Sequence, residues 1–392
     1  MGIQSLTMRS ALALQCLLLF NGHCEKMRIG IDGRPFLGAR TGIGRYVYEL
    51  CRCLDDLLPE ATFFVYSNCA VELPVSSHRW KLVQDAHPLA KYMKTVIWLK
   101  LRCGTLCDAD NLDVFWGNST FLPSLPKKTR TVITVYDLVH QIAPESMPFL
   151  RRWAYKLFFG DAVKRADCIT TISQGTSDRL FQQFGRRANA IISPAIDSQF
   201  KPKTMAEIKT CLDQYAIPTP YILSVATREP RKNLDLLIKA FLDLKRSGQI
   251  AHHKLVLVGG MGWKDKRLTS LIGNTLGNDV IALGYMPDEV LPAIYSGADL
   301  FVFPSKYEGF GMPVLEARGC GTTVVTSDIP ELREAGGEDA IYIQPTLDGI
   351  CQGILAGLSQ EKRSQSLKDP LPSWEVSARC LAQTFVKTQE MI

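Results

Sequence analysis

The sequence lacks the residue spacings that mark a metal centre or a redox motif. Its 12 cysteines are scattered with no Cys-x-x-Cys pair, and its 6 histidines form no cluster that could complete a zinc site. No run of about 18 uninterrupted apolar residues occurs, so any membrane contact is expected to be peripheral. The apolar or small-residue surroundings of Cys168 and Cys320 indicate buried, reduced thiols, and we therefore expect a cytoplasmic protein.

A strong charge of either sign is also missing. The net charge is only +6 and the isoelectric point is about 8.6. Such a mild excess suits anionic phosphate ligands or an anionic membrane surface, but it is too weak to indicate a nucleic-acid partner.

The length and patterning indicate two domains. With 392 residues the chain is too long for one ordinary α/β domain. Short apolar strands alternate with amphipathic helices in both halves, which predicts two doubly wound parallel sheets, in an N-terminal domain over 27–200 and a C-terminal domain over 201–372. A terminal helix is expected over 373–392. Strands are expected at 27–32, 62–66, 114–116, 130–135, 168–172, 191–193, 221–226, 254–258, 280–283, 300–303 and 322–326.

Residues 1–26 are expected to lie outside the fold. Arg9 precedes an apolar run that ends at Phe20 and has the length of a signal peptide, about half a bilayer span. One interpretation is a secretion signal. The simpler one is an upstream extension, because Met27 opens a strand-like segment as a natural start would.

The most informative segment follows the expected strand at 300–303. Glu308 and Glu316 enclose Gly-Phe-Gly-Met-Pro-Val-Leu, in which Pro313 suits the first turn of a helix. Glycines let backbone N–H groups approach a ligand, and a helix N-terminus favours phosphate. Each glutamate can accept hydrogen bonds from sugar hydroxyls. The alternative is that Glu308 is a solvated loop residue and that Glu316 is a first-turn charge that complements the helix dipole.

The segment from Glu308 to Glu316 resembles the E-x7-E signature of retaining, nucleotide-sugar-dependent glycosyltransferases of family 4, which have the GT-B architecture. The resemblance implies that Glu316 holds the ribose of the donor. It also implies that Glu308, with backbone N–H groups around Phe310, Gly311 and Met312, holds the transferred sugar. In the family the terminal helix crosses back onto the N-terminal domain.

A basic turn follows the first expected strand of the second half. Arg231 and Lys232 open a helix at this point, where positive charge can stabilise a departing diphosphate. The pair resembles the family's diphosphate-binding Arg/Lys pair, and the alternative is a solvated basic turn. In one branch of the family a further arginine stands where this chain has Ala226, and whether Arg228 replaces it is open.

Gly42 and Gly44 belong to a glycine-rich loop expected between the first strand and the first helix. This loop resembles the family's N-terminal glycine loop that faces the donor phosphates. A glycine-rich turn could also hold NAD, but the spacing Gly-x-Gly-x-x-Gly is absent because Val47 stands at the third position.

Tyr136 and Asp137 follow the strand expected at 130–135, in a segment that resembles the acceptor side of the family's site. Many members have His where this chain has Tyr136, so a histidine role is unassigned and a role for Asp137 is kept. His140 is nearby, but a lone loop histidine is more often at the surface than catalytic.

Asp108 and Asp110 match the Asp-x-Asp pattern of metal-dependent glycosyltransferases. Such a short match is common by chance, and its polar setting indicates a solvated turn, so no metal site is predicted. A second segment, with Lys91, Lys94 and Lys100 among apolar residues, could lie on anionic lipid. A core helix with snorkelling lysines explains it equally well.

Together these features predict a glycosyltransferase that takes its sugar from a nucleotide diphosphate sugar without a metal or other cofactor. The opening Ile-Gly-Ile-Asp-Gly-Arg-Pro segment is most similar to bacterial mannosyltransferases of surface-polysaccharide assembly, which use GDP-mannose. The acceptor implied is a glycan or a polyprenyl-linked glycan, at the inner face of the membrane. The alternatives are a sugar-nucleotide epimerase of the same architecture, for which no convincing acid/base set is found, and a non-catalytic scaffold subunit.

Overall fold

The computed structural model describes residues 26–38, 42–144, 149–260, 279–360, 367 and 369–391. The extension expected at 1–26 lies outside these residues, apart from Lys26. Within the described part of the chain, no helix is long and apolar enough to cross a bilayer.

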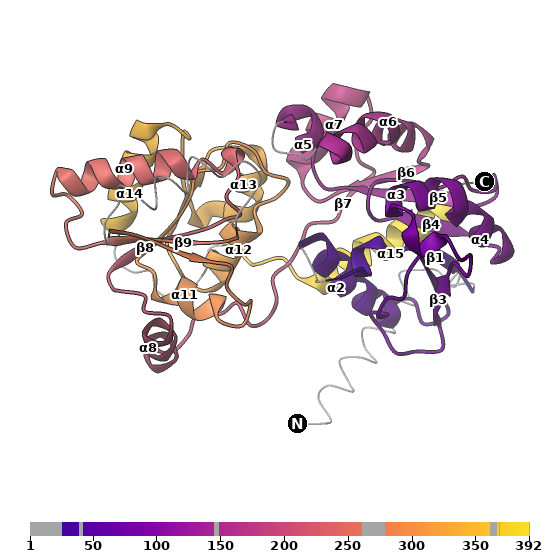
Figure 1. The fold of residues 1–392 in the computed structure, drawn as a ribbon, viewed down its shortest axis with the longest axis horizontal. Coiled ribbons are helices and arrows are strands. Elements are labelled where there is room, and N and C mark those ends of the chain that lie inside the picture. Colours follow the sequence, from indigo (N-terminus) through magenta and orange to yellow (C-terminus); the bar gives the residue numbers. More distant parts are fainter. Residues whose placement is uncertain are drawn as a thin grey trace.

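The N-terminal domain is built on a parallel sheet of seven strands in the order β3-β2-β1-β4-β5-β6-β7 (Figure 1). Because these central strands are buried on both faces, their sequences contain continuous apolar runs such as Val114 to Trp116. The strands are β1 (Arg28–Asp32), β2 (Thr62–Ser67), β3 (Trp80–Gln84), β4 (Val114–Gly117), β5 (Arg130–Val135), β6 (Cys168–Thr171) and β7 (Ala190–Ile191).

The C-terminal domain repeats this plan with six parallel strands in the order β10-β9-β8-β11-β12-β13. The strands are β8 (Tyr221–Val225), β9 (Lys254–Val258), β10 (Val280–Gly284), β11 (Leu300–Phe303), β12 (Val324–Ser327) and β13 (Ile341–Ile343). The two sheets confirm the predicted doubly wound α/β class. The boundaries drawn near residues 200 and 372 remain predictions.

Helices cover the faces of both sheets (Figure 1). Those of the N-terminal domain are η1 (Arg34–Phe36), α2 (Gly42–Leu57), η2 (Ala90–Tyr92), α3 (Thr95–Trp98), the π-helix η3 (Leu99–Cys103), α4 (Gly104–Ala109), α5 (Val139–Ile142), α6 (Phe149–Arg165) and α7 (Gln174–Phe184). The later ones are α8 (Met205–Gln214), η5 (Pro230–Lys232), α9 (Leu234–Arg246), α11 (Leu291–Gly297), α12 (Met312–Gly319), α13 (Pro330–Gly336), η7 (Gly337–Asp339), α14 (Leu347–Leu358) and α15 (Trp374–Gln389).

The last helix, α15, lies in the N-terminal domain although it follows the C-terminal domain in sequence (Figure 1). It begins at an N-cap, where the Ser373 hydroxyl accepts a hydrogen bond from the Val376 N–H. Phe385 of α15 is fully buried, and its ring meets that of Trp116 on β4 edge-on with 5.8 Å between centroids. The chain therefore crosses between the domains twice, which ties their positions together.

Candidate active site

The strand order of the C-terminal sheet fixes where a ligand can bind. The chain leaves β8 toward β9 on one side and β11 toward β12 on the other, so the topological switch point lies between β8 and β11. Open parallel sheets bind ligands at the carboxyl ends of the strands at such a point. The loops after β8 and β11 meet there, where the Lys306 N–H donates to the Arg231 carbonyl oxygen at 2.8 Å.

Glu308 and the predicted Arg/Lys pair come together in these two loops. The Lys232 ammonium donates to Glu308 Oε1 at 2.6 Å, and Arg231 Nη1 donates to Glu308 Oε2 at 3.0 Å. A second carboxylate, Glu229, accepts from Arg231 Nε at 2.8 Å. The Lys232 ammonium also lies over the Phe303 ring, 4.9 Å from its centroid. Neither of the solvated interpretations fits, because Glu308 is 7% exposed and Lys232 is 9% exposed.

The ion pair sets the protonation of its members. Burial by itself would raise the pKa of Glu308, but Lys232 and Arg231 outweigh it, so this pKa lies below its ordinary value and the carboxylate stays ionised. Burial lowers the pKa of Lys232. The site thus offers two cations to a diphosphate and a carboxylate to a sugar.

The N-terminal domain reaches this loop through the end of β5. Tyr307 accepts a hydrogen bond on its hydroxyl oxygen from the Leu138 N–H at 2.6 Å. A side chain at Gly309 would place its Cβ 2.4 Å from the Tyr136 carbonyl oxygen, so only glycine allows this approach. Burial lowers the pKa of Arg231, but the nearby carboxylates of Glu308 and Glu229 raise it above its ordinary value. Asp137 is near enough to add a smaller effect in the same direction. The structure therefore places Asp137 beside the predicted catalytic residues.

Glu316 belongs to the helix that follows the Glu308 loop and lies apart from the ion pair. It lies on α12, where its Oε2 accepts from the Tyr295 hydroxyl at 2.9 Å. Burial raises the pKa of Glu316 to about 7, against the lowering effects of the Tyr295 hydrogen bond and of Arg45. Arg45 comes from α2 of the N-terminal domain and forms an ion pair with Asp288 at 3.1 Å. Glu316 therefore faces a charged contact between the domains.

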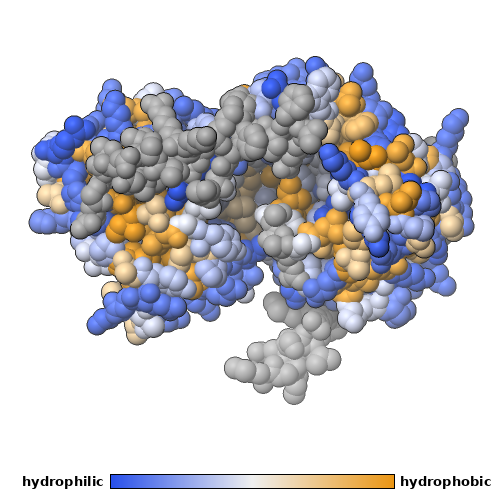
Figure 2. Space-filling view, in the orientation of Figure 1, coloured by the Kyte–Doolittle hydropathy of each residue, from blue (hydrophilic) through white to orange (hydrophobic). Residues whose placement is uncertain are grey.

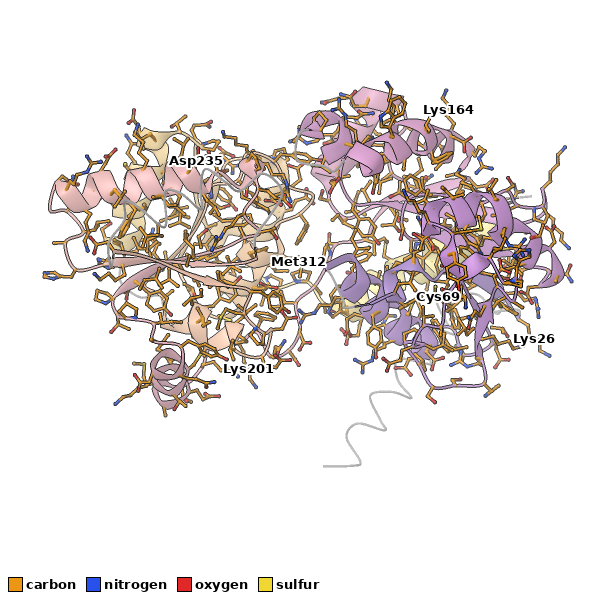
Figure 3. All side chains as sticks on the ribbon, viewed as in Figure 1. Lys26, Cys69, Lys164, Lys201, Asp235 and Met312 are labelled. Atoms are coloured by element: carbon orange, nitrogen blue, oxygen red, sulfur yellow. The ribbon has the colours of Figure 1, made fainter. Side chains whose placement is uncertain are left out.

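The three residues whose backbone is predicted to hold the sugar have distinct surroundings. Phe310 is buried, whereas Met312 at the start of α12 lies on the side of the C-terminal domain that faces the N-terminal domain (Figure 3). Gly311 has a φ of 116°, a conformation that other residues rarely adopt, and a Cβ at this position would lie 2.5 Å from Leu332 Cδ2. The surface is hollowed between the two domains (Figure 2).

Two interpretations from the sequence are wrong, that of a glycine loop and that of His140 as a surface residue. Gly42 and Gly44 lie in the first turn of α2 and not in a loop, because the helix already begins at Gly42. The expected turn follows α4, where Asp108 is exposed in the last turn of the helix and the half-buried Asp110 caps it and accepts from the Tyr66 hydroxyl at 2.7 Å. His140 is buried against the rings of Tyr155 and Phe159, and burial lowers its pKa to about 4.

Four residues of the site were missed in the sequence. Tyr295, Tyr307 and Arg45 act through tertiary contacts, whereas Glu229 pairs with Arg231 two residues further along the same turn. Three of them had a local signal, since Tyr307 directly precedes Glu308, Arg45 directly follows Gly44, and Glu229 stands two residues before Arg231.

Comparison with known proteins covers both domains. Residues 40–200 match Glycosyltransferase Family 4, and residues 213–368 match Glycosyl transferases group 1. The chain is 33% identical to the O-antigen chain mannosyltransferase B of Escherichia coli, over 91% of this chain and 95% of that protein. It is 28% identical to a GDP-mannose-dependent alpha-(1-6)-phosphatidylinositol monomannoside mannosyltransferase of Mycolicibacterium smegmatis, over 52% of this chain and 56% of that protein.

The fold has a solved counterpart as well. A sucrose-phosphate synthase from Thermosynechococcus elongatus superposes with a TM-score of 0.64 at 18% identity, covering 93% of this chain and 94% of that chain. The matches confirm the predicted resemblance and the GT-B fold.

The raised pKa of Glu316 predicts a pH-dependent stability. Between its ordinary value of 4.5 and about 7 the folded protein holds a proton that the unfolded chain has lost, so stability falls as the pH rises through this window. The slope can reach about 1.4 kcal/mol per pH unit. We expect Glu316→Gln to lack this loss and to become more stable than the parent by about 1–3 kcal/mol between pH 5 and pH 8. Urea unfolding at four pH values measures it.

Glu60→Gln, at an exposed position, is the matched control and should follow the parent at every pH. Parallel stability curves for Glu316→Gln and the parent would contradict the raised pKa.

Proposed function

Because this chain belongs to glycosyltransferase family 4, we propose that it transfers a mannosyl group from GDP-mannose to a glycan or lipid-linked glycan, with retention of the anomeric configuration. The observation that carries the proposal is the buried contact of Glu308 with Lys232 and Arg231 at the switch point. The choice of donor is supported by the mannosyltransferases among its relatives, one of which is named as GDP-mannose-dependent.

The proposed chemistry depends on charge that develops on the diphosphate. As the bond between the sugar C1 and the diphosphate oxygen breaks, Arg231 and Lys232 move from Glu308 to the departing phosphates and stabilise them. Glu308 is then left to accept hydrogen bonds from the sugar hydroxyls. These interactions strengthen in the transition state, so they accelerate the reaction and do more than tighten binding.

Retention follows from attack on the same face of the sugar. The acceptor oxygen forms its bond to C1 on the face that the diphosphate leaves, and a phosphate oxygen of the leaving group takes the acceptor proton. No protein nucleophile takes part. Asp137, whose charge contributes to the raised pKa of Arg231, is assigned to the acceptor side in this proposal and orients the acceptor hydroxyl.

The nucleotide is proposed to lie along α12. Glu316 accepts the ribose hydroxyls, as an acidic residue does in dinucleotide folds. The backbone around Phe310, Gly311 and Met312 faces the sugar. The first turn of α2, with Gly42 and Gly44, approaches the phosphates from the N-terminal domain.

Substitution of the ion pair tests the catalytic assignment. We expect Glu308→Ala and Lys232→Ala each to lower the rate of transfer at least about a hundredfold, the scale of losing one charge-stabilising group. Glu60→Ala and Lys239→Ala, which change exposed residues outside the site, should transfer at the parent rate. Near-normal transfer by either site variant would refute the assignment, and thermal unfolding checks that all four variants are folded.

A panel of donors tests the sugar nucleotide. GDP-mannose should raise the melting temperature more than UDP- or dTDP-sugars, because a ligand that binds only the folded state stabilises it by mass action. Transfer from it should persist in EDTA, since Arg231 and Lys232 supply the positive charge. A larger shift with another nucleotide, loss of transfer in EDTA, or an epimerised product from donor alone would each contradict the proposal.

We also propose that one surface of the N-terminal domain rests on anionic lipid, where a lipid-linked acceptor would be found. Tyr92, Ile97 and Leu101 of the segment η2-α3-η3 are 75%, 45% and 70% exposed, and Lys91 and Lys94 beside them are exposed too. Apolar residues reach the surface of this domain in Figure 2. The alternative of a core helix applies only to part of the segment, since Trp98 and Leu99 are buried.

Lysines near an anionic membrane contribute about 1 kcal/mol each. The double variant Lys91→Ala/Lys94→Ala should therefore reduce co-sedimentation with phosphatidylserine vesicles about tenfold or more. Lys100 is left in place because its ammonium pairs with Asp161 at 3.2 Å. The control Lys209→Ala/Lys239→Ala removes two exposed lysines of the C-terminal domain. Equal binding by both double variants would contradict the lipid contact.

A further inference from the structure

Two glutamates of α13 fasten the C-terminal domain to helix α7 of the N-terminal domain. The Glu334 carboxylate accepts from the backbone N–H groups of Gln174 and Gly175, at 2.8 Å and 3.0 Å. These are the first two residues of α7, where unpaired N–H groups and the helix dipole favour a negative charge. The contact therefore uses the backbone of one domain and a side chain of the other.

The second glutamate makes the contact stronger and more specific. Arg179, one turn further along α7, donates through Nε to Glu331 Oε1 at 2.7 Å and through Nη2 to Oε2 at 3.3 Å. Glu331 is fully buried, so loss of Arg179 would leave a buried carboxyl group without its ion-pair partner. A Cβ at Gly175 would lie 2.7 Å from the Glu331 carboxyl carbon, so a larger residue would displace the Glu331 carboxylate.

The same helix also holds the loop that carries Glu308. The Arg179 guanidinium lies over the Tyr307 ring, 5.3 Å from its centroid. The Ser173 hydroxyl, which caps α7, donates to the Gly309 carbonyl oxygen at 2.8 Å. The residues on both sides of Glu308 are thus in contact with the N-terminal domain.

We propose that Arg179, Glu331 and Glu334 form an interdomain latch that positions Glu308 for transfer by holding α7 against α13 and against the Tyr307–Gly309 loop. The effect of the latch on the rate of transfer rests on the proposed function, in which Glu308 binds the transferred sugar. Its effect on the contact between the domains does not. The three are positioning residues, since they act through Tyr307 and Gly309. Closing the domains also excludes water from the donor.

Kinetics and solution scattering on the full-length protein test the latch. We expect Glu334→Gln and Arg179→Met to lower kcat for mannosyl transfer about tenfold or more and to increase the radius of gyration with GDP-mannose bound. The affinity for GDP alone should change less than about threefold, because the nucleotide contacts assigned to α12 and η5 stay intact. Arg179→Lys, which keeps the charge but loses the paired geometry, should lie between the parent and Arg179→Met.

Glu338→Gln, in the neighbouring η7, is the control and should match the parent. A parent-like kcat and radius of gyration in both latch variants would overturn the proposal. If Glu308→Ala transfers normally while the latch variants still expand the molecule, the assignment of Glu308 fails and the latch stands. If Glu308→Ala is inactive and the latch variants behave as the parent, the latch alone fails.

Discussion

The buried contact between Lys232 and Glu308 is the constraint on which the site depends. An ammonium and a carboxylate taken out of water are costly unless they meet each other, and removing one partner of such a pair costs about 3–5 kcal/mol. The contact therefore requires the loops after β8 and β11 to meet, which they do because these strands are neighbours in the sheet. Because Glu308 pairs with Arg231 and Lys232, both cations are kept at the switch point between β8 and β11. A diphosphate that binds there can take the place of Glu308.

The site is completed by the N-terminal domain. The Glu308 loop has the C-terminal cations on one side and the backbone of Tyr136 and Leu138 on the other. Arg45 of α2 lowers the pKa of Glu316 and so partly offsets the effect of its burial. A residue assigned to the donor therefore depends on contacts from the domain assigned to the acceptor, which explains how domain closure and chemistry can be coupled.

Much of the fold could be predicted because its strands are buried on both faces. The strand β11 is a continuous apolar run and β8 is interrupted only by Ser224, and both are bounded by turn residues, a strong local signal. The edge strands β3 and β13 were missed, because β3 mixes Lys81 and Gln84 into a half-exposed segment and β13 has only three residues. The buried position of His140 was equally hidden, since the rings of Tyr155 and Phe159 that cover it come from another helix.

The sequence by itself determined the family, the two-domain α/β class and the segments that carry Glu308, Glu316, Arg231 and Lys232, because each depends on residues close together in the chain. Only the tertiary structure decided that Glu308 pairs with both cations, that Glu316 lies apart beside Tyr295, and that α7 docks on α13. The reason is physical: burial, charge pairing and the pKa shifts they cause arise between segments that are tens to more than a hundred residues apart, as with Gln174 and Glu334, 160 positions apart.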